Sequence, residues 1–125
     1  MSFFSEEDKA ANKEAAEKKA AVERQHRRNA PRVANNLIDR LEESARSTFR
    51  DGREVREISG HDGKSASNFV DQEILTEVLI ATVEERFKRD KSTFRVHLYQ
   101  STDWEDRDCW FQGNSVTVFF DPPLT

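Results

Sequence analysis

The stretch PRVANNLIDRLEESARSTFRDG, residues 31–52, decides the fold class of this chain. Its apolar side chains recur at intervals of three and four positions, the spacing that places them on one face of an α-helix. They are Val33, Leu37, Ile38, Leu41, Ala45 and Phe49. Pro31 suits the first turn of a helix, and Gly52 suits the position just after its end. The stretch therefore predicts an amphipathic helix whose apolar face packs on another layer.

A second segment with the same spacing lies in residues 68–89. Asn68 is expected to cap this helix, because Asp71 follows three residues later. The predicted buried face consists of Val70, Ile74, Leu75, Val78, Leu79, Val83 and Phe87. The chain therefore contains two helices whose apolar faces require a shared core.

The apolar spacing changes to two in residues 94–99, which predicts a strand. One face of this strand carries Phe94, Val96 and Leu98, and the other carries Arg95, His97 and Tyr99. Because side chains alternate along a strand, only one of these faces can meet the helices. The apolar set is expected to face them.

A final strand is predicted for SVTVFF, residues 115–120, after a turn at Gly113 and Asn114. Val116, Val118 and Phe120 share one face, whereas Thr117 and Phe119 share the other. Pro122 and Pro123 are expected to end the sheet, because proline cannot donate to its hydrogen-bond ladder. Weaker strands are predicted for residues 53–59 and within 101–113.

The N-terminal 31 residues are polar, and residues 5–29 read as a long helix. Ser5 is the expected N-cap, with carboxylates in the first turn. The only apolar stripe on this helix consists of Ala11, Ala15 and Val22, which is too thin to hold it on a core. The predicted organisation is a polar helical arm, residues 1–31, followed by a globular domain, residues 32–125.

The predicted fold class is α+β. Two amphipathic helices pack on one face of a small antiparallel sheet, and a long polar N-terminal helix precedes them.

Charge is divided unevenly between the two parts. The net charge of −4 arises from +2 on residues 1–32, with eight basic and six acidic side chains, and −6 on residues 33–125, with twelve and eighteen. An acidic domain disfavours broad electrostatic binding of nucleic acid.

The sequence carries no sign of export or of membrane insertion. Cys109 is the only cysteine, so no intrachain disulfide forms. The chain has no apolar run near the length of a membrane span, and its first residues turn acidic too early for a signal peptide. We expect a protein of the cytoplasm, or of the host cytoplasm or virion if the chain is viral.

The segment STDWEDRDCWFQG, residues 101–113, gathers four acids, two tryptophans and Cys109. A calcium loop starting at Asp103 would need glycine where Asp108 stands and glutamate where Asn114 stands. The surrounding carboxylates would raise the pKa of the Cys109 thiol and so disfavour a nucleophile. The segment predicts no dedicated metal site and no catalytic residue.

Other chemical motifs are equally weak. GHDGKS, residues 60–65, has Ile58 where a phosphate loop needs its first glycine. His26, His61 and His97 lie far apart and form no ligand pair. The sequence therefore predicts a protein that is not an enzyme and carries no cofactor or metal.

Aromatic side chains are the most informative candidates for a binding surface. If the apolar strand faces meet the helices, Tyr99 and Phe119 must point away from them. Trp104 and Trp110 are expected to join them beside acids such as Asp106, forming an aromatic-acidic sheet edge. Such aromatics are typical of protein interfaces, unless the N-terminal helix or the tail DPPLT covers them.

The end of the arm forms a cationic patch around Arg24, Arg27 and Arg28. It is either a solvated helix end balanced by Glu17 and Glu23, or a contact for phosphates. An acidic protein would also be a suitable partner for this cationic patch, and the acidic domain of a second copy of this chain is one such protein.

The predicted function is a non-enzymatic protein-interaction or assembly module that binds a protein partner or itself. Small chains without motifs occur among viral and phage accessory proteins. The alternative is a nucleic-acid-associated factor that uses the arginines of the arm. An enzyme with a carboxylate-bound metal ranks third.

Overall fold

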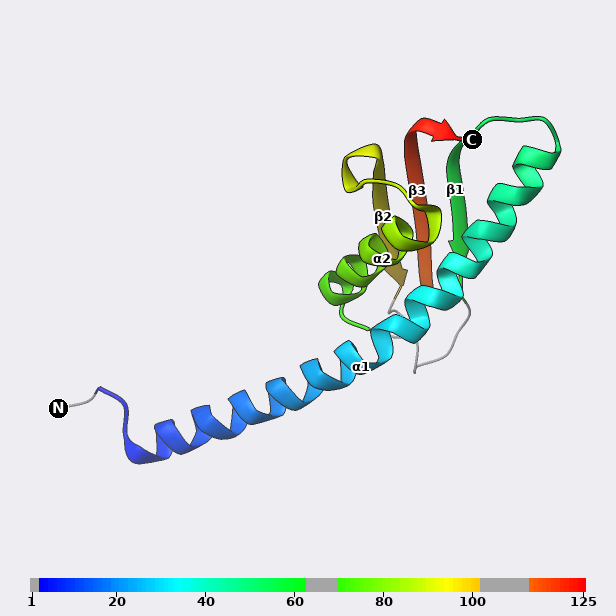
Figure 1. Ribbon diagram of the computed structural model, residues 1–125. Coiled ribbons are helices and arrows are strands. Elements are labelled where there is room, and N and C mark those ends of the chain that lie inside the picture. Colours follow the sequence, from blue (N-terminus) through cyan, green and yellow to red (C-terminus); the bar gives the residue numbers. More distant parts are fainter. Residues whose placement is uncertain (1–2, 63–69, 102–112) are drawn as a thin grey trace.

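The computed structural model describes residues 3–62, 70–101 and 113–125 (Figure 1). The elements follow in the order α1 (Glu6–Arg50), β1 (Val55–His61), α2 (Gln72–Phe87), a short 3₁₀ helix (Lys91–Thr93), β2 (Phe94–Ser101) and β3 (Gly113–Leu124). Figure 1 shows both helices on the same side of the sheet, α1 against β1 and α2 against β2. The predicted α+β class is confirmed.

The described strands form a three-stranded antiparallel sheet in the order β1-β3-β2. Val118 in the central strand pairs with Ile58 on one side and with Val96 on the other. These residues point toward the helices, as the alternation predicted for Val96 and Val118.

The core lies between the helices and the inner face of the sheet. Its buried side chains are Ala30, Val33, Ala34, Leu37, Ile38, Leu41, Ala45, Val55, Ile58, Val70, Ile74, Leu75, Leu79, Val83, Phe94, Val116, Val118 and Phe120. Each fully buried leucine or isoleucine contributes about 1.5–3 kcal/mol through removal of its apolar surface from water. Phe49, which the helical pattern assigned to the core, is 59% exposed near the end of α1 at Arg50.

Gly60 allows β1 to lie close to α1. A Cβ atom at this position would stand 3.3 Å from Leu41 Cδ2 and 3.5 Å from the Leu37 carbonyl oxygen. The absence of a side chain therefore determines how closely the sheet approaches the helix.

The expected boundary between two helices at Pro31 is wrong, because α1 continues through it. Proline removes one helical hydrogen bond, but the helix-forming residues before it and the core contacts of Val33 and Leu37 after it hold the backbone. The start of the helix is as predicted. The Ser5 hydroxyl accepts a hydrogen bond from the Asp8 N–H, and the Asp8 carboxylate accepts one from the Ser5 N–H, both at 3.1 Å.

The start of α2 differs from the prediction. Asp71 is itself the N-cap, and its carboxylate accepts hydrogen bonds from the N–H groups of Glu73 and Ile74. Asn68, the expected cap, lies outside the described residues. Val70 is buried as predicted, but it precedes the helix.

Both ends of β3 also differ from the prediction. Gly113 and Asn114 belong to the strand rather than to a turn, since they pair with Ser101 and Gln100. At the other end the strand continues through both prolines to Leu124. The register shifts between Glu57, which pairs with Phe119, and Val55, which pairs with Leu124. The prolines lie in this irregular stretch, where no regular ladder bond is required of them. The strand predicted within 101–113 falls almost wholly outside the described residues.

Candidate interaction surfaces

The outer face of the sheet, on the side away from the helices, carries three rows of side chains. Phe119 lies between Glu57 and Arg95, Thr117 between Ser59 and His97, and Ser115 between His61 and Tyr99. We call these nine residues the outer sheet face. The expectation that Tyr99 and Phe119 point away from the helices is confirmed.

Phe119 and Tyr99 differ in exposure. The His97 ring lies edge-on to the Phe119 ring at 5.3 Å, and the Arg95 guanidinium lies 6.0 Å from its centre, so Phe119 is half-buried. Tyr99 is 60% exposed. Neither the N-terminal helix nor the tail covers Tyr99, because α1 packs against the opposite side and Leu124 packs against the core. Trp104, Asp106 and Trp110 lie outside the described residues, so their predicted place at this edge stays a prediction.

One end of the sheet contains a buried polar cluster. The Asp62 carboxylate accepts hydrogen bonds from the Asn114 backbone N–H at 2.8 Å and from its side-chain amide at 3.2 Å. Gln100 donates to the Asn114 side-chain oxygen at 2.9 Å and to the Val70 carbonyl at 2.8 Å. The cluster joins β1, β2 and β3 to the start of α2.

A groove of about 860 Å³ separates the exposed part of α1 from the start of α2. Its lining residues are Lys18, Lys19, Val22, Glu23, His26, Arg27, Asp71, Glu73, Ile74 and Glu77. We call it the α1–α2 groove. Val22 and Ile74 supply its apolar side chains, and charged side chains surround them.

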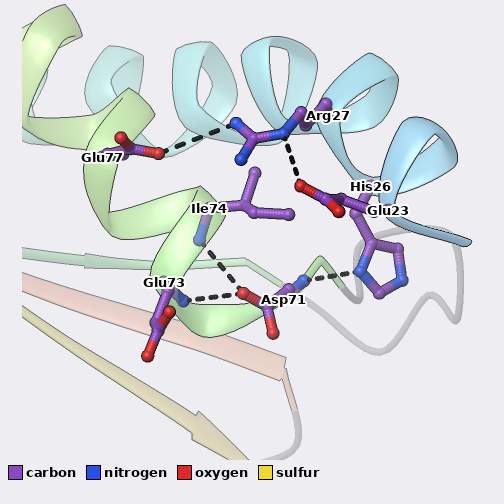
Figure 2. Close-up of polar contacts among 7 residues, drawn as sticks. All are labelled: Glu23, His26, Arg27, Asp71, Glu73, Ile74 and Glu77. Atoms are coloured by element: carbon purple, nitrogen blue, oxygen red, sulfur yellow. Dashed lines mark hydrogen bonds and ion pairs between the residues drawn. The ribbon is translucent and has the colours of Figure 1, made fainter. Parts of the chain in front are cut away.

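Polar contacts across this groove hold α1 to α2 (Figure 2). His26 Nδ1 accepts a hydrogen bond from the Asp71 N–H at 3.1 Å, which requires the unprotonated form of that nitrogen. The Arg27 guanidinium bonds to Glu23 at 3.1 Å and lies 3.7 Å from a Glu77 oxygen. Figure 2 shows the Ile74 side chain below this arginine, on the groove side of α2. The pairing of Arg27 with Glu23 is the balance that the sequence suggested.

No residue from position 3 to position 29 is buried, although α1 covers this stretch from Glu6 onward. From here on, the name arm is kept for residues 6–25, the exposed helical part of the predicted arm of residues 1–31. Phe3 and Phe4, just before it, are 94% and 60% exposed, and Val22 within it is 51% exposed. Arg24 and Arg28 are exposed, and neither forms an ion pair with another of the described residues. Figure 1 shows the arm extending away from the domain.

Hydrogen bonds shift the pKa of several charged side chains. Hydrogen bonds to Asp39, then to Glu42, raise the pKa of Arg86, which links α2 to α1. A hydrogen bond to Glu54 raises the pKa of Arg56. Hydrogen bonds from the backbone and then the hydroxyl of Ser92 lower the pKa of Asp90, which caps the 3₁₀ helix. All of these groups lie outside the α1–α2 groove and the outer sheet face.

Two further observations concern the described ranges only. Within them, no three histidine, cysteine or acidic side chains come together as metal ligands would. The helices formed by these residues are not long and apolar enough to cross a membrane.

Comparisons with models of known protein families, with curated proteins and with solved structures give no match to this chain. Its function must therefore be argued from the two surfaces.

Sequence reasoning missed the α1–α2 groove. Val22 is noticeable as an isolated apolar residue in the arm, but its neighbour Ile74 lies 52 positions later. Nothing in the spacing of either segment indicates that they meet. Part of the outer sheet face was predicted, because period-two alternation assigns Arg95, His97, Tyr99, Thr117 and Phe119 to one side. The residues of β1 on this face were not assigned, since Val55 and Ile58 stand three positions apart.

Proposed function

We propose that this chain is a non-enzymatic protein-interaction module that binds through its arm and its outer sheet face. The observation that carries the proposal is the arm itself. It is continuous with the packed part of α1, yet none of its own residues is buried. A helix that buries nothing gains no tertiary stabilisation and is marginal in water, so a partner is the natural source of its missing contacts.

The geometry of the arm favours tight binding. Residues 33–45 of the same helix are packed in the domain, so they hold the base of the arm in position. Association then orders fewer residues than it would for a disordered tail, and the entropic cost of binding falls. The exposed aromatic rings of Phe3, Phe4 and Tyr99 are of the type that dominates binding energy at interfaces.

A protein partner is favoured over nucleic acid. Of the three arginines expected to contact phosphates, Arg27 is already engaged by Glu23 and Glu77. Residues 33–125 carry a net charge of −6. Phosphate binding requires several exposed cations that are not balanced by nearby acids.

The test is affinity capture with surface variants. We would compare the full chain with Val22→Asp in the arm and Tyr99→Glu on the outer sheet face. Ala16→Asp and Ala81→Glu are the matched controls, because both sites are exposed but lie on other faces of their helices. We expect at least one surface variant to lose a bound protein that both controls retain. The proposal would be overturned if all four variants retained the same set of bound proteins, further copies of this chain included.

A further inference from the structure

We infer that the partner of the arm is a second copy of this chain, packed antiparallel, with Phe4 of each copy in the α1–α2 groove of the other. The inference rests on the proposed function and names the partner of the same surface. Three properties of residues 3–28 support it: the position of their apolar side chains, their charge distribution and the location of the groove.

The apolar side chains of the arm share one face. At about 100° of rotation per residue, Ala11, Ala15 and Val22 fall within roughly 40° of one another. Phe4 lies beside this face, since Phe3, Phe4 and Ala11 line one depression over the first turns. All four residues are exposed. The face is therefore unpartnered along its whole length.

An antiparallel pair of arms brings these side chains into contact. When Ala11 of one copy lies opposite Ala15 of the other, Phe4 lies opposite Val22 at both ends. The alanines permit close approach of the two axes at the centre. The larger side chains then form the two symmetric ends of a two-fold contact, as an isologous interface requires.

The charges of the arm favour the same arrangement. Residues 6–17 contain five acids and two lysines, a net charge of −3, whereas residues 18–28 contain five bases and one acid, a net charge of +4. Antiparallel packing places the acidic end of each copy against the basic end of the other, and Asp8 opposite Lys18. Parallel packing would place like charges together. The helix dipoles also favour the antiparallel pair.

The α1–α2 groove receives the end of the partner's arm. Val22, in the arm, lines the groove together with Ile74. The partner's Phe4, opposite Val22, would cover both of these side chains. Lys18 and Lys19 line the same groove and would lie near the partner's first helical turn, which begins with two glutamates. The contact therefore joins apolar burial to charge complementarity.

Cysteine cross-linking tests the orientation. In full-length chains carrying Cys109→Ser, we would introduce Ala11→Cys and Ala15→Cys separately and oxidise each alone and both mixed. In the antiparallel pair, position 11 of one copy faces position 15 of the other. Identical positions are offset by about 6 Å along the axis, too far for easy bridging. We expect disulfide-linked dimers mainly in the mixture. Dimers in the single-variant samples, or none in any sample, would overturn the arrangement.

Sedimentation equilibrium tests the contacts. We expect Phe4→Ala and Val22→Asp each to raise the dimer dissociation constant at least about tenfold. The first removes an apolar contact, and the second introduces a charge into it. Ala16→Asp, which points about a third of a turn away from the apolar face, should leave the constant nearly unchanged. Dissociation should also increase with salt, since the paired charges are screened. A full-length chain that stays monomeric at high concentration would overturn the inference.

Failure of this inference can be separated from failure of the proposed function. If the chain is monomeric but Val22→Asp still loses a captured protein, the inference is wrong and the interaction module stands. If the mixed cysteine variants cross-link and no other protein is captured, the inference stands and self-association is the whole of the function.

Discussion

Asn114 links the Asp62 carboxylate, just after β1, to Gln100 in β2. Its side chain donates to the buried Asp62 carboxylate and accepts from Gln100. Asn114→Ala removes both hydrogen bonds and leaves the carboxylate with fewer donors in a place that water reaches poorly. We expect a loss of about 1–3 kcal/mol in the free energy of unfolding, measured by urea denaturation.

A second variant, Asn114→Asp, tests whether the charge of Asp62 accounts for the loss of stability. It places a second carboxylate beside Asp62, so the variant should be less stable than Asn114→Ala at neutral pH. The deficit should shrink as the pH is lowered and one of the two carboxyls becomes protonated. Asn35→Asp, on the exposed side of α1, is the control and should change stability little. Equal stability of the two Asn114 variants at neutral pH would contradict the importance of the Asp62 charge.

Asp90, just before the start of β2, is expected to contribute to folding stability in a pH-dependent way. Its carboxylate accepts hydrogen bonds from the Ser92 N–H at 2.9 Å and the Ser92 hydroxyl at 2.8 Å, and these lower its pKa below 3.8. A lowered pKa in the folded state adds stability above the ordinary value, and that stability is lost as the pH falls through the folded value. Asp90→Ala should therefore reduce the melting temperature at neutral pH but have a smaller effect in strong acid. A difference that is the same at every pH would contradict this origin.

At the scale of the element, α1 continues where its sequence contains a proline. Pro31 is exposed and does not belong to the core cluster. Its replacement by alanine restores a backbone donor and removes a clash with the preceding turn. We expect Pro31→Ala to increase helicity by circular dichroism and to stabilise the chain by about 1–3 kcal/mol. Asn35→Ala improves propensity alone and should add only about 0.5 kcal/mol. A destabilised Pro31→Ala would show that the proline matters to the packing of α1.

Periodicity predicted the elements well and their ends less well. The spacing of Leu37, Ile38 and Leu41 identifies a helix, and the alternation of Phe94 and Val96 identifies a strand, because each pattern follows from one repeating geometry. The helix boundary predicted at Pro31 was wrong. The tendency of proline to end a helix was overridden by the helix-forming residues before it and the core packing of the residues after it. The start of α2 was placed too early because Asp71 can serve either as the N-cap or as the third helical residue of a capping box that begins at Asn68.

For the candidate surfaces, features that depend on one repeating pattern could be predicted from the sequence, whereas features that depend on contacts between separate segments could not. The orientation of Tyr99 and Phe119 could be predicted, since it depends only on alternation within one strand. The partial cover of Phe119 could not, because it depends on how Arg95 and His97 orient on the neighbouring strand. The α1–α2 groove required knowledge of where two distant segments meet, which single-sequence patterns do not contain.

At the scale of the whole molecule, one helix spans two environments. Residues 33–45 of α1 hold the core together, whereas the arm has only its own hydrogen bonds and side-chain pairs such as Glu14–Lys18 at 3.5 Å. A pair this exposed adds little stability. The two halves of the helix should therefore open with very different free energies in the monomer.

Hydrogen exchange of backbone amides measures this difference directly. In a dilute sample, we expect amides of residues 10–25 to exchange at least about a hundredfold faster than those of residues 37–45, because the arm opens by local fraying and the core segment only with the domain. Raising the concentration should slow exchange in the arm alone if two arms pair, and Val22→Asp should abolish that protection. Equal protection of both segments in the dilute sample would mean that the arm is stabilised within a single chain, and its role as an open binding surface would then be wrong.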